Sequence, residues 1–384
     1  MRIGIIGAGP AGIEAALAVC RANAEAILYT AEPALPYFRP RLVALAMGQV
    51  APEAIAMHPA EWYADRGIHL RTGEPVQAVD RSSRRITTPG GTETFDGIVI
   101  ASGAKPVRPH FQGETSESPI FTLWSIADAT AIRRRVRPGA RLVVIGGGIL
   151  GLECALRARE QQLAVTVVEK LPRLLPMQLG ETASTLLRSV LEGKGICLRI
   201  GNAVTGIHNH PGSGPVVQVH LSDGDPVKAD LVMVCIGSGP DLTLARQAGL
   251  ATGRGILADA FLHAAPCVFV AGDGCQADGR PARGAVREAA AQGKLAGANA
   301  VASITGGTLQ RFIPEVIPVS LRCAGVELCA AGQVGGTGVF ERRLDNGTDP
   351  GVIRLISRDS DRVVGVQMIG SREGFDDFLR EISR

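Results

Sequence analysis

Apolar residues at the start of the chain change their spacing within twenty positions. Residues 2–6 form a short, mostly β-branched apolar run, and residues 13–20 repeat apolar side chains at helical spacing. Between the two stands the glycine-rich sequence Gly7-Ala8-Gly9-Pro10-Ala11-Gly12. The pattern predicts a strand, a tight turn and a helix.

The three glycines of this turn have different physical roles. Gly7 makes the turn, Gly9 lets the backbone approach a pyrophosphate, and Gly12 lets the helix pack closely on the strand. The N-terminus of the helix adds free N–H groups and the positive end of a dipole. We therefore predict a dinucleotide site built from Gly7, Gly9, Pro10, Ala11 and Gly12.

An acidic side chain at the end of the next strand commonly binds the ribose of such a dinucleotide. A count of 23 residues from Gly7 reaches Thr30, which carries no charge. Glu32 follows two residues later, after Ala31, and is the predicted ribose ligand. The alternative is that Glu32 is a solvated loop carboxylate.

The same pattern returns in the middle of the chain. The apolar run Arg141–Ile145 is followed by Gly146-Gly147-Gly148-Ile149-Leu150-Gly151 and by helical spacing over residues 152–160. The repeat indicates a duplicated fold. Its predicted dinucleotide site consists of Gly146, Gly148, Ile149, Leu150 and Gly151.

The second fold also supplies an acidic residue at the expected distance. The strand predicted over residues 164–168 is followed by Glu169, which lies 23 residues after Gly146. A glutamate at this position binds the ribose diol and repels a 2′-phosphate, so NAD is favoured over NADP. Lys170 and Arg173 follow closely and keep NADP open as the alternative.

Beyond Phe312 the pattern changes to short alternating strands and a final helix. The strands are predicted over residues 317–321, 325–329, 352–357 and 362–369, and the helix over residues 373–382. Together they predict a small α+β domain at the C-terminus.

Composition narrows the classes of partner. The 384 residues are 46% hydrophobic, and 40 basic against 37 acidic side chains leave a net charge of +3, which argues against nucleic acid or an anionic membrane. No apolar run reaches the roughly 18 residues of a membrane span. The N-terminal run is interrupted too early for a signal peptide, so a cytoplasmic location is expected. The eight cysteines contain no C-x-x-C pair, and no metal site is predicted.

Three further segments carry a resemblance to a known family. They are Pro36-Tyr37-Phe38-Arg39-Pro40-Arg41-Leu42, Ala101-Ser102-Gly103-Ala104-Lys105-Pro106, and Ala271-Gly272-Asp273. Together with the two glycine-rich turns, they resemble the flavoprotein reductases that bind two dinucleotides. NADH:rubredoxin oxidoreductases and the reductase part of the nitrite reductase large subunit are the most similar branches. The resemblance covers almost the whole chain.

The resemblance implies FAD on the first fold and NAD(H) on the second. In this family the residue at the position of Asp273 hydrogen-bonds the ribityl chain, that of Arg39 contacts FAD, and that of Val76 reads the adenine. The predicted FAD site therefore also includes Ala31, Glu32, Ala101 and Gly103, and the predicted NAD site also includes Glu153, Glu169 and Gly237. A surface guanidinium is the alternative for Arg39. A carboxylate that favours the helix dipole is the alternative for Glu153, which the family places near the nicotinamide.

Two positions depart from the ferredoxin reductases of aromatic-ring dioxygenases. A lysine of those proteins, two residues after the position of Leu42, is Ala44 here, and one of their arginines is Trp124 here. Both differences predict that the chain lies outside that branch.

The predicted fold class is α/β, with two Rossmann-like domains of the glutathione-reductase type that bind FAD and NAD(P), and a small α+β C-terminal domain. Residues 1–110 and 238–308 are expected to form the FAD-binding domain, residues 111–237 the NAD-binding domain, and residues 309–384 the C-terminal interface domain. Relatives use this last domain as a dimer interface or as a surface that faces the electron acceptor. A homo-oligomer and a hetero-oligomer both stay open.

The segment at residues 36–46 indicates the chemistry. Disulfide reductases of the family carry a cysteine pair there, and this chain has no cysteine in the segment. Electrons that arrive on FAD as hydride must therefore leave without a local disulfide. FAD can release them singly to rubredoxin, ferredoxin or an iron–sulfur subunit. Hydride transfer needs only positioning, so no catalytic acid or base is expected.

Two other functions stay open at this stage. One is an NADH oxidase that passes electrons to oxygen or a small acceptor, and the other is a non-enzymatic protein that binds both cofactors for interaction. The sequence does not determine the electron acceptor, the physiological direction, or whether the chain is a subunit of a larger complex.

Overall fold

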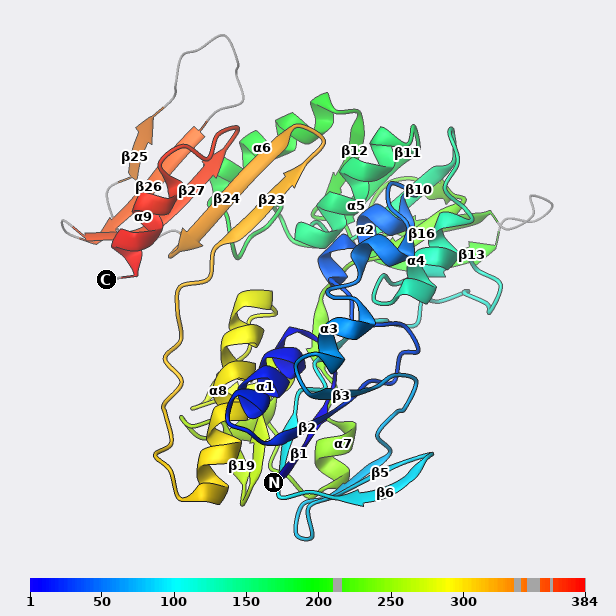
Figure 1. Cartoon of the computed structure of the whole chain (residues 1–384). Helices are drawn as coiled ribbons and strands as arrows, with labels where there is room; N and C mark the ends of the chain where they lie inside the picture. Colours follow the sequence, from blue (N-terminus) through cyan, green and yellow to red (C-terminus); the bar gives the residue numbers. More distant parts are fainter. Residues whose placement is uncertain (210–215, 335–339, 344–352, 360–361, 384) are drawn as a thin grey trace. The chain divides into compact units, whose positions relative to one another are not determined.

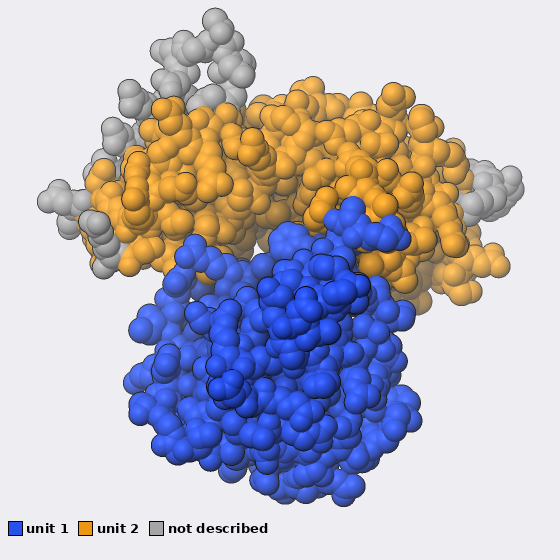
Figure 2. Space-filling view, viewed as in Figure 1, with its two compact units in different colours: residues 1–39, 53–105, 238–315 blue, residues 40–52, 106–237, 316–384 orange. Residues whose placement is uncertain are grey.

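A computed structural model describes the chain except for residues 210–215, 335–339, 344–352, 360–361 and 384 (Figure 1). The chain divides into two compact units. Unit 1 comprises residues 1–39, 53–105 and 238–315, and unit 2 comprises residues 40–52, 106–237 and 316–384 (Figure 2). Each unit contains one of the two glycine-rich turns. The finer division into three domains stays a prediction.

Unit 1 is built on a six-stranded sheet in the order β19-β20-β7-β1-β2-β3. Every neighbouring pair is parallel except β19 with β20. The strand β7 is buried at every residue, as expected for a parallel sheet that is covered on both faces. The bounds are β1 Arg2–Ile6, β2 Glu25–Tyr29, β3 Ile68–Arg71, β7 Gly97–Ile100, β19 His263–Ala265 and β20 Val268–Val270.

Two helices of unit 1, α1 (Pro10–Arg21) and α8 (Val286–Thr305), pack side by side (Figure 1). Glycines make this approach close: a Cβ at Gly293 would overlap the carbonyl oxygen of Ala11, and a Cβ at Gly297 would overlap that of Ala15. α8 ends where Gly306 takes a left-handed conformation with φ of +73°. The helix α8 therefore runs over 20 residues before this glycine ends it.

Smaller elements complete unit 1. The sheet β4-β5-β6 is antiparallel, and β18, β21 and β22 form another small sheet. The bounds are β4 Ala78–Asp80, β5 Arg85–Thr88, β6 Gly91–Thr94, β18 Ile256–Ala258, β21 Cys275–Ala277, β22 Arg280–Pro281, α3 Ala60–Ala64, α7 Thr243–Gln247 and η3 Gly272–Gly274. At the borders of the unit lie η1 Arg39–Arg41, η2 Pro52–Ile55, β8 Ala104–Pro106 and β17 Ser238–Pro240.

Unit 2 repeats the plan with a five-stranded parallel sheet in the order β12-β11-β10-β16-β9. The antiparallel sheet β13-β14-β15 packs on one face, where its Ile207 and Val219 join Val143 and Val232 in one hydrophobic cluster. The strands are β9 Ile120–Phe121, β10 Arg141–Ile145, β11 Ala164–Glu169, β12 Ile196–Ile200, β13 Val204–Asn209, β14 Val217–Leu221, β15 Val227–Ala229 and β16 Leu231–Val234. The helices are α2 Leu42–Ala46, α4 Ile126–Arg133, α5 Ile149–Glu160 and α6 Glu181–Gly193.

The C-terminal part of unit 2 is an antiparallel sheet in the order β23-β24-β27-β26-β25, against which α9 packs through Phe375 and Ile382. The bounds are β23 Val319–Cys323, β24 Val326–Gly332, β25 Phe340–Arg343, β26 Ile353–Asp359, β27 Arg362–Ile369 and α9 Phe375–Ile382. The predicted strands and helix are confirmed with shifted ends, except that residue 352 lies outside the described residues. Sequence reasoning missed β25.

The two mainly parallel sheets with their helices confirm the predicted α/β class. Among the residues that the structure describes, no helix combines the length and the apolar character that crossing a membrane requires.

Candidate dinucleotide sites

The first glycine-rich turn joins β1 to α1 and packs closely against neighbouring backbone. Gly7 has φ of +102°, and a Cβ there would overlap the carbonyl oxygen of Ala101, which follows β7. A Cβ at Gly12 would overlap the carbonyl oxygen of Gly7. Gly9 differs, because the position of its missing Cβ has no atom within 4 Å. Gly9 therefore faces open space at the N-terminus of α1, where a pyrophosphate can approach the backbone.

The strand order places this turn at a crevice. β2 and β3 lie on one side of β1, and β7 and β20 lie on the other side. The strand order therefore reverses at β1. In open α/β sheets, ligands bind at such a switch point, outside the carboxyl ends of the strands. Ala101 and Gly103 follow β7 at this edge, and Asp273 follows β20, the next strand. The fold thus brings these three predicted residues to the edge that carries the first turn.

A buried hydrogen bond shapes the turn that carries Asp273. The N–H of Gly272 donates to Oε1 of Gln292 at 2.8 Å, and Gly272 has φ of +78°. A Cβ at Gly274 would lie 3.2 Å from the carbonyl oxygen of Gly103, so the two predicted FAD segments touch. The neighbouring Ser102 Oγ is buried, and no described group hydrogen-bonds to it.

An unsatisfied buried hydroxyl beside an open cradle fits a polar group of a bound cofactor. Sequence reasoning did not single out Ser102, although its place between Ala101 and Gly103 was the available signal. The side chains present therefore fit FAD.

Asp273 has unusual electrostatic surroundings. Burial raises the pKa of Asp273, the negative charge of Glu288 raises it further, and the positive charge of Arg39 opposes both. Glu288 is itself buried in the first turn of α8, where Arg283 Nη2 donates to it at 2.8 Å. Asp273 consequently holds a proton more strongly than an exposed aspartate does.

Glu32 and Arg39, predicted separately, are bonded to each other. Arg39 Nη2 donates to Glu32 Oε1 at 2.7 Å, and the Tyr37 hydroxyl donates to Glu32 Oε2 at 2.5 Å. Arg39 Nη1 also reaches the Tyr37 hydroxyl at 3.2 Å. The Arg39 guanidinium is exposed at the surface and paired with Glu32, and the roles of both residues toward FAD stay predictions. Val76 is partly buried against the core of the unit.

The second turn repeats the geometry of the first. Gly146 has φ of +110°, and a Cβ there would overlap the carbonyl oxygen of Cys235, which follows β16. A Cβ at Gly151 would overlap the carbonyl oxygen of Gly146, whereas Gly148 faces open space. β10 lies between β11 and β16, so this turn also stands at a switch point.

Glu169 is buried at the end of β11 and bonded to the backbone around the turn. Its Oε2 accepts the N–H of Gly147 at 2.6 Å, and its Oε1 accepts the N–H of Leu171 at 2.7 Å. Two backbone donors therefore fix the carboxylate beside the second cradle. This is the place where the sequence predicts a ribose ligand.

Three exposed apolar side chains follow the strands that end at the second cradle. Leu150, Leu171 and Ile236 are 37%, 47% and 44% exposed, although side chains of this type are usually buried. They follow the neighbouring strands β10, β11 and β16, and Gly237 comes directly after Ile236. Exposed apolar side chains beside an open phosphate cradle fit the flat rings of a nicotinamide dinucleotide.

Glu153 belongs to an ion pair on α5. Arg157 Nε donates to Glu153 Oε1 at 2.9 Å, and Arg157 Nη1 donates to Gln49 Oε1 at 2.7 Å. The first turn of α5 contains no acidic residue, so the structure does not support the helix-dipole alternative for Glu153. The part of the chain that the structure describes contains no group of three or more metal-ligating side chains.

The chain matches a known protein family over most of its length. Residues 1–293 match the family model of the pyridine nucleotide-disulphide oxidoreductases, and the chain belongs to this family. The ferredoxin–NAD(+) reductase component of the biphenyl dioxygenase system of Paraburkholderia xenovorans (strain LB400) is 35% identical over 275 residues, which cover 71% of this chain and 66% of that protein. A rubredoxin-NAD(+) reductase of Ectopseudomonas oleovorans is 32% identical over 263 residues, which cover 67% of this chain and 68% of that protein.

A solved structure agrees with these similarities. The covalent putidaredoxin reductase–putidaredoxin complex superposes with a TM-score of 0.88 at 25% identity, and the match covers 100% of this chain and 93% of that chain. The predicted family is confirmed, and the chain is an oxidoreductase with FAD and NAD(H) as cofactors. The individual roles predicted for the site residues stay predictions.

The two departures at Ala44 and Trp124 do not separate the chain from the dioxygenase reductases. Identity to the dioxygenase component is 35%, and identity to the rubredoxin reductase is 32%. Two positions carry little weight against similarity that extends over 275 residues. The prediction that the chain lies outside the dioxygenase branch is therefore unsupported.

Proposed function

We propose that the chain transfers electrons from NADH, through FAD, to a protein that accepts one electron at a time. Relatives named for ferredoxin and rubredoxin support this choice of acceptor. Bound FAD would supply the conversion of a two-electron hydride into single electrons. An iron–sulfur subunit of a larger complex is an acceptor of the same chemical class.

The positions of the cysteines and the protonation of Cys275 are the observation that supports the proposal. Residues 36–46, where family members place redox thiols, contain no cysteine. Cys275 is the cysteine closest in sequence to Asp273, and it is buried. Burial and the charge of Glu288 raise the pKa of Cys275 to about 12, so it remains a thiol near neutral pH. A protonated, buried thiol is not a nucleophile, and electrons need another exit.

In this proposal the protein binds the two dinucleotides and orients them. The backbone around Gly9 and Gly148 binds the phosphates, and Glu169 binds a ribose and disfavours a 2′-phosphate. Arg39 and Tyr37 orient Glu32 toward the adenosine half of FAD. No side chain has to move a proton, because hydride transfer depends on positioning. A cytoplasmic location and an oligomer, homomeric or heteromeric, stay predictions.

The test is an anaerobic rapid-mixing experiment on the full chain reconstituted with FAD. NADH should bleach the flavin absorbance, and the reduced protein is then mixed with rubredoxin, with a [2Fe–2S] ferredoxin, or with air-saturated buffer. We expect at least one protein carrier to reoxidise the flavin ten or more times faster than oxygen does. Faster reoxidation by oxygen than by either carrier would support the oxidase alternative instead. Flavin that NADH does not bleach would contradict both.

A further inference from the structure

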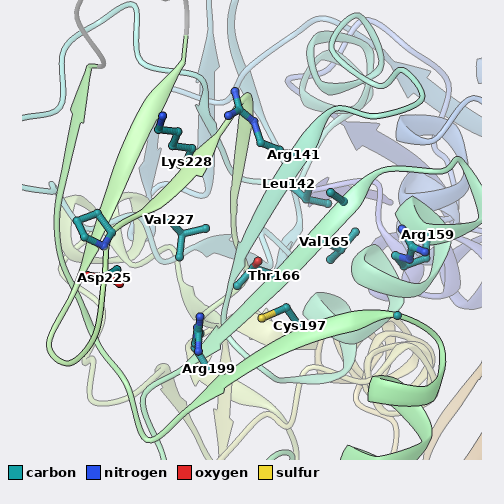
Figure 3. A pocket seen from close by; sticks show the side chains of 13 residues that line it. Arg141, Leu142, Arg159, Val165, Thr166, Cys197, Arg199, Asp225, Val227 and Lys228 are labelled. Atoms are coloured by element: carbon teal, nitrogen blue, oxygen red, sulfur yellow. The ribbon is translucent and has the colours of Figure 1, made fainter.

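The loop that follows β11 leads from the second cradle to the C-terminal sheet. It comprises residues 170–180, between Glu169 at the end of β11 and the start of α6. The hollow of about 610 Å³ in Figure 3 reaches the opposite end of β11, because Ala164 and Thr166 in its lining begin this strand. Its lining contains no residue of the loop. The loop therefore belongs to the cradle end of the sheet.

The first half of the loop contacts the cradle directly. The N–H of Leu171 donates to Oε1 of Glu169 at 2.7 Å. Leu174 is fully buried and lies against Gly147, where a Cβ would come within 2.6 Å of its Cδ2 atom. Gly147 in turn donates its N–H to Oε2 of Glu169 at 2.6 Å. A displacement of the loop would therefore move both the carboxylate and the backbone of the cradle.

The middle of the loop has a strained backbone. Leu175 has φ of +47°, a left-handed conformation that is uncommon for residues other than glycine. The N–H groups of Gln178 and Leu179 both donate to the carbonyl oxygen of Leu175, at 2.9 and 2.8 Å, and close a tight turn. Strained conformations of this kind persist only where the surrounding structure fixes them. The contacts at both ends of the loop consequently matter for its shape.

The far end of the loop is bound to the C-terminal sheet. Gly180 donates its N–H to Oε1 of Gln367, on β27, at 2.7 Å. Because a backbone N–H can only donate, the amide oxygen of Gln367 must face Gly180. Gly180 is the N-cap of α6, and no side chain caps this helix from its own N-cap position. Gln367 therefore accepts a backbone N–H that the helix itself leaves without a partner.

Packing alone does not explain a glutamine at this position. Val366 and Met368, its two neighbours, join α9 in a hydrophobic cluster, so alternation places Gln367 on the other face of β27. Gln367 is only 1% exposed, and among the described residues its Nε2 has no hydrogen-bond partner. A buried amide group with an unsatisfied donor costs stability that an apolar side chain would not cost. The bond to Gly180 is the compensating contact that the structure shows.

We propose that Gln367 is a positioning residue for NAD(H). Its bond to Gly180 holds the far end of the loop, and the loop in turn fixes Gly147 and Glu169. The C-terminal sheet therefore contributes to the affinity for the nicotinamide cofactor without placing a residue in the cradle. The proposal rests on the predicted place of NAD(H) at the second cradle, and the identity of the electron acceptor does not enter it.

Calorimetric titration of the full chain, reconstituted with FAD, measures the effect on NAD⁺ binding. Gln367→Met keeps the length of the side chain and removes the acceptor, so NAD⁺ should bind about fivefold more weakly or worse. Gln367→Glu keeps an oxygen at the N-terminus of α6, where a carboxylate is favoured, and should bind NAD⁺ within about twofold of the wild type. Calorimetry needs no electron acceptor, so failure to reduce a protein carrier would leave this test unaffected.

Two controls separate positioning from a general loss of stability. Affinity for FAD, measured on the FAD-free protein, should change less than about twofold in Gln367→Met, because the first cradle lies in unit 1. Ser357→Ala removes another buried polar group of the same sheet, one whose Oγ has no described hydrogen-bond partner. It should bind NAD⁺ like the wild type.

Hydrogen exchange followed by mass spectrometry gives a second readout. In the NAD-free protein, the backbone amides of residues 171–180 should exchange faster in Gln367→Met than in the wild type, whereas those of residues 7–12 should not change. If Gln367→Met does not fold, the wild type alone decides: saturating NAD⁺ should slow exchange of residues 171–180. The proposal is overturned by equal NAD⁺ affinity in Gln367→Met and the wild type, by equal losses for FAD and NAD⁺, or by unchanged exchange of residues 171–180.

Discussion

Three predicted acidic ligands are held by the protein in different ways. Glu169 accepts two backbone N–H groups, and Glu32 accepts side-chain donors from Tyr37 and Arg39. Asp273 has a raised pKa because it is buried beside the charge of Glu288. The first two carboxylates are fixed in place by donors, whereas the ionised form of Asp273 is destabilised by its surroundings.

We expect Asp273→Asn to stabilise the FAD-free protein at neutral pH. The folded-state pKa of Asp273 is raised, so its ionised form costs stability above that pKa, and the cost disappears below the unfolded pKa near ~3.9. The melting temperature should rise by about 2 to 4 °C at pH 8, and the gap should close as the pH falls toward about 4. Thermal unfolding from pH 4 to 8 measures this gap, with Asp65→Asn as an exposed aspartate control in the same unit. A gap that is equal at every pH would contradict the electrostatic explanation.

Replacing Glu169 should change the choice between nicotinamide cofactors. Glu169→Gln removes the charge that repels a 2′-phosphate and weakens a charge-assisted hydrogen bond to the ribose. We expect the apparent affinity for NADH to fall about tenfold and the preference for NADH over NADPH to narrow. Rates of flavin reduction against the concentration of each cofactor measure both effects. Glu181→Gln, at an exposed position that begins α6, is the control. An unchanged ratio between the two cofactors would remove Glu169 from the discrimination.

At the scale of the element, the two strand–turn–helix units use their glycines alike. The first and third glycines of each turn, Gly7 with Gly12 and Gly146 with Gly151, stand where a Cβ would overlap backbone. Gly9 and Gly148 instead face open space and have negative φ values of −76° and −79°. Any residue can adopt that backbone conformation, so packing within the element does not require glycine at these two positions. The glycines at these two positions instead suit the close approach of a ligand to the backbone.

The variants Gly9→Ala and Gly12→Ala should therefore fail in different ways. Gly9→Ala should leave the melting temperature of the FAD-free protein within about 2 °C of the wild type, because the methyl group enters open space. It should nevertheless weaken FAD binding at least tenfold, measured by flavin fluorescence. Gly12→Ala should destabilise the FAD-free protein by about 1 to 3 kcal/mol, because its methyl group overlaps the Gly7 carbonyl. Equal loss of stability in both variants would argue against a ligand role for Gly9.

At the scale of the whole molecule, the burial of most cysteines is typical of residues with a structural role. Five of the eight, Cys154, Cys235, Cys275, Cys323 and Cys329, are buried, and all eight are free. Burial raises the pKa of Cys323 and Cys329 to about 11. Near neutral pH these side chains are thiols and behave as small apolar residues. Electron flow through the molecule should consequently not depend on thiol chemistry.

Alkylation with N-ethylmaleimide tests this expectation on the whole protein. Under native conditions the reagent should modify the exposed Cys197, and the rate at which NADH reduces the flavin should change less than twofold. Transfer from the flavin to a protein carrier should be preserved to the same extent. The control is a family member with a redox disulfide, treated identically after reduction, which should lose activity. Loss of electron transfer in this chain after modification of Cys197 alone would contradict a route without thiols.

Local patterns in the sequence were sufficient for the two cradles, the α/β class and the family. A strand, a tight turn and a helix are neighbours along the chain, so the spacing of apolar residues and glycines predicts them directly. Glu169, 23 residues after Gly146, lies at the end of β11. The equivalent position in the first fold is the uncharged Thr30, and Glu32 is the acidic residue two positions later. The absence of cysteine at residues 36–46 was likewise visible in the sequence and indicated the route of the electrons.

Only the tertiary structure decided which distant residues meet. The bond from Gly272 to Gln292, the charge of Glu288 beside Asp273, and the overlap that excludes a Cβ at Gly293 each join segments that no local pattern relates. Periodicity records which face a residue occupies, whereas burial and electrostatics depend on what packs against that face.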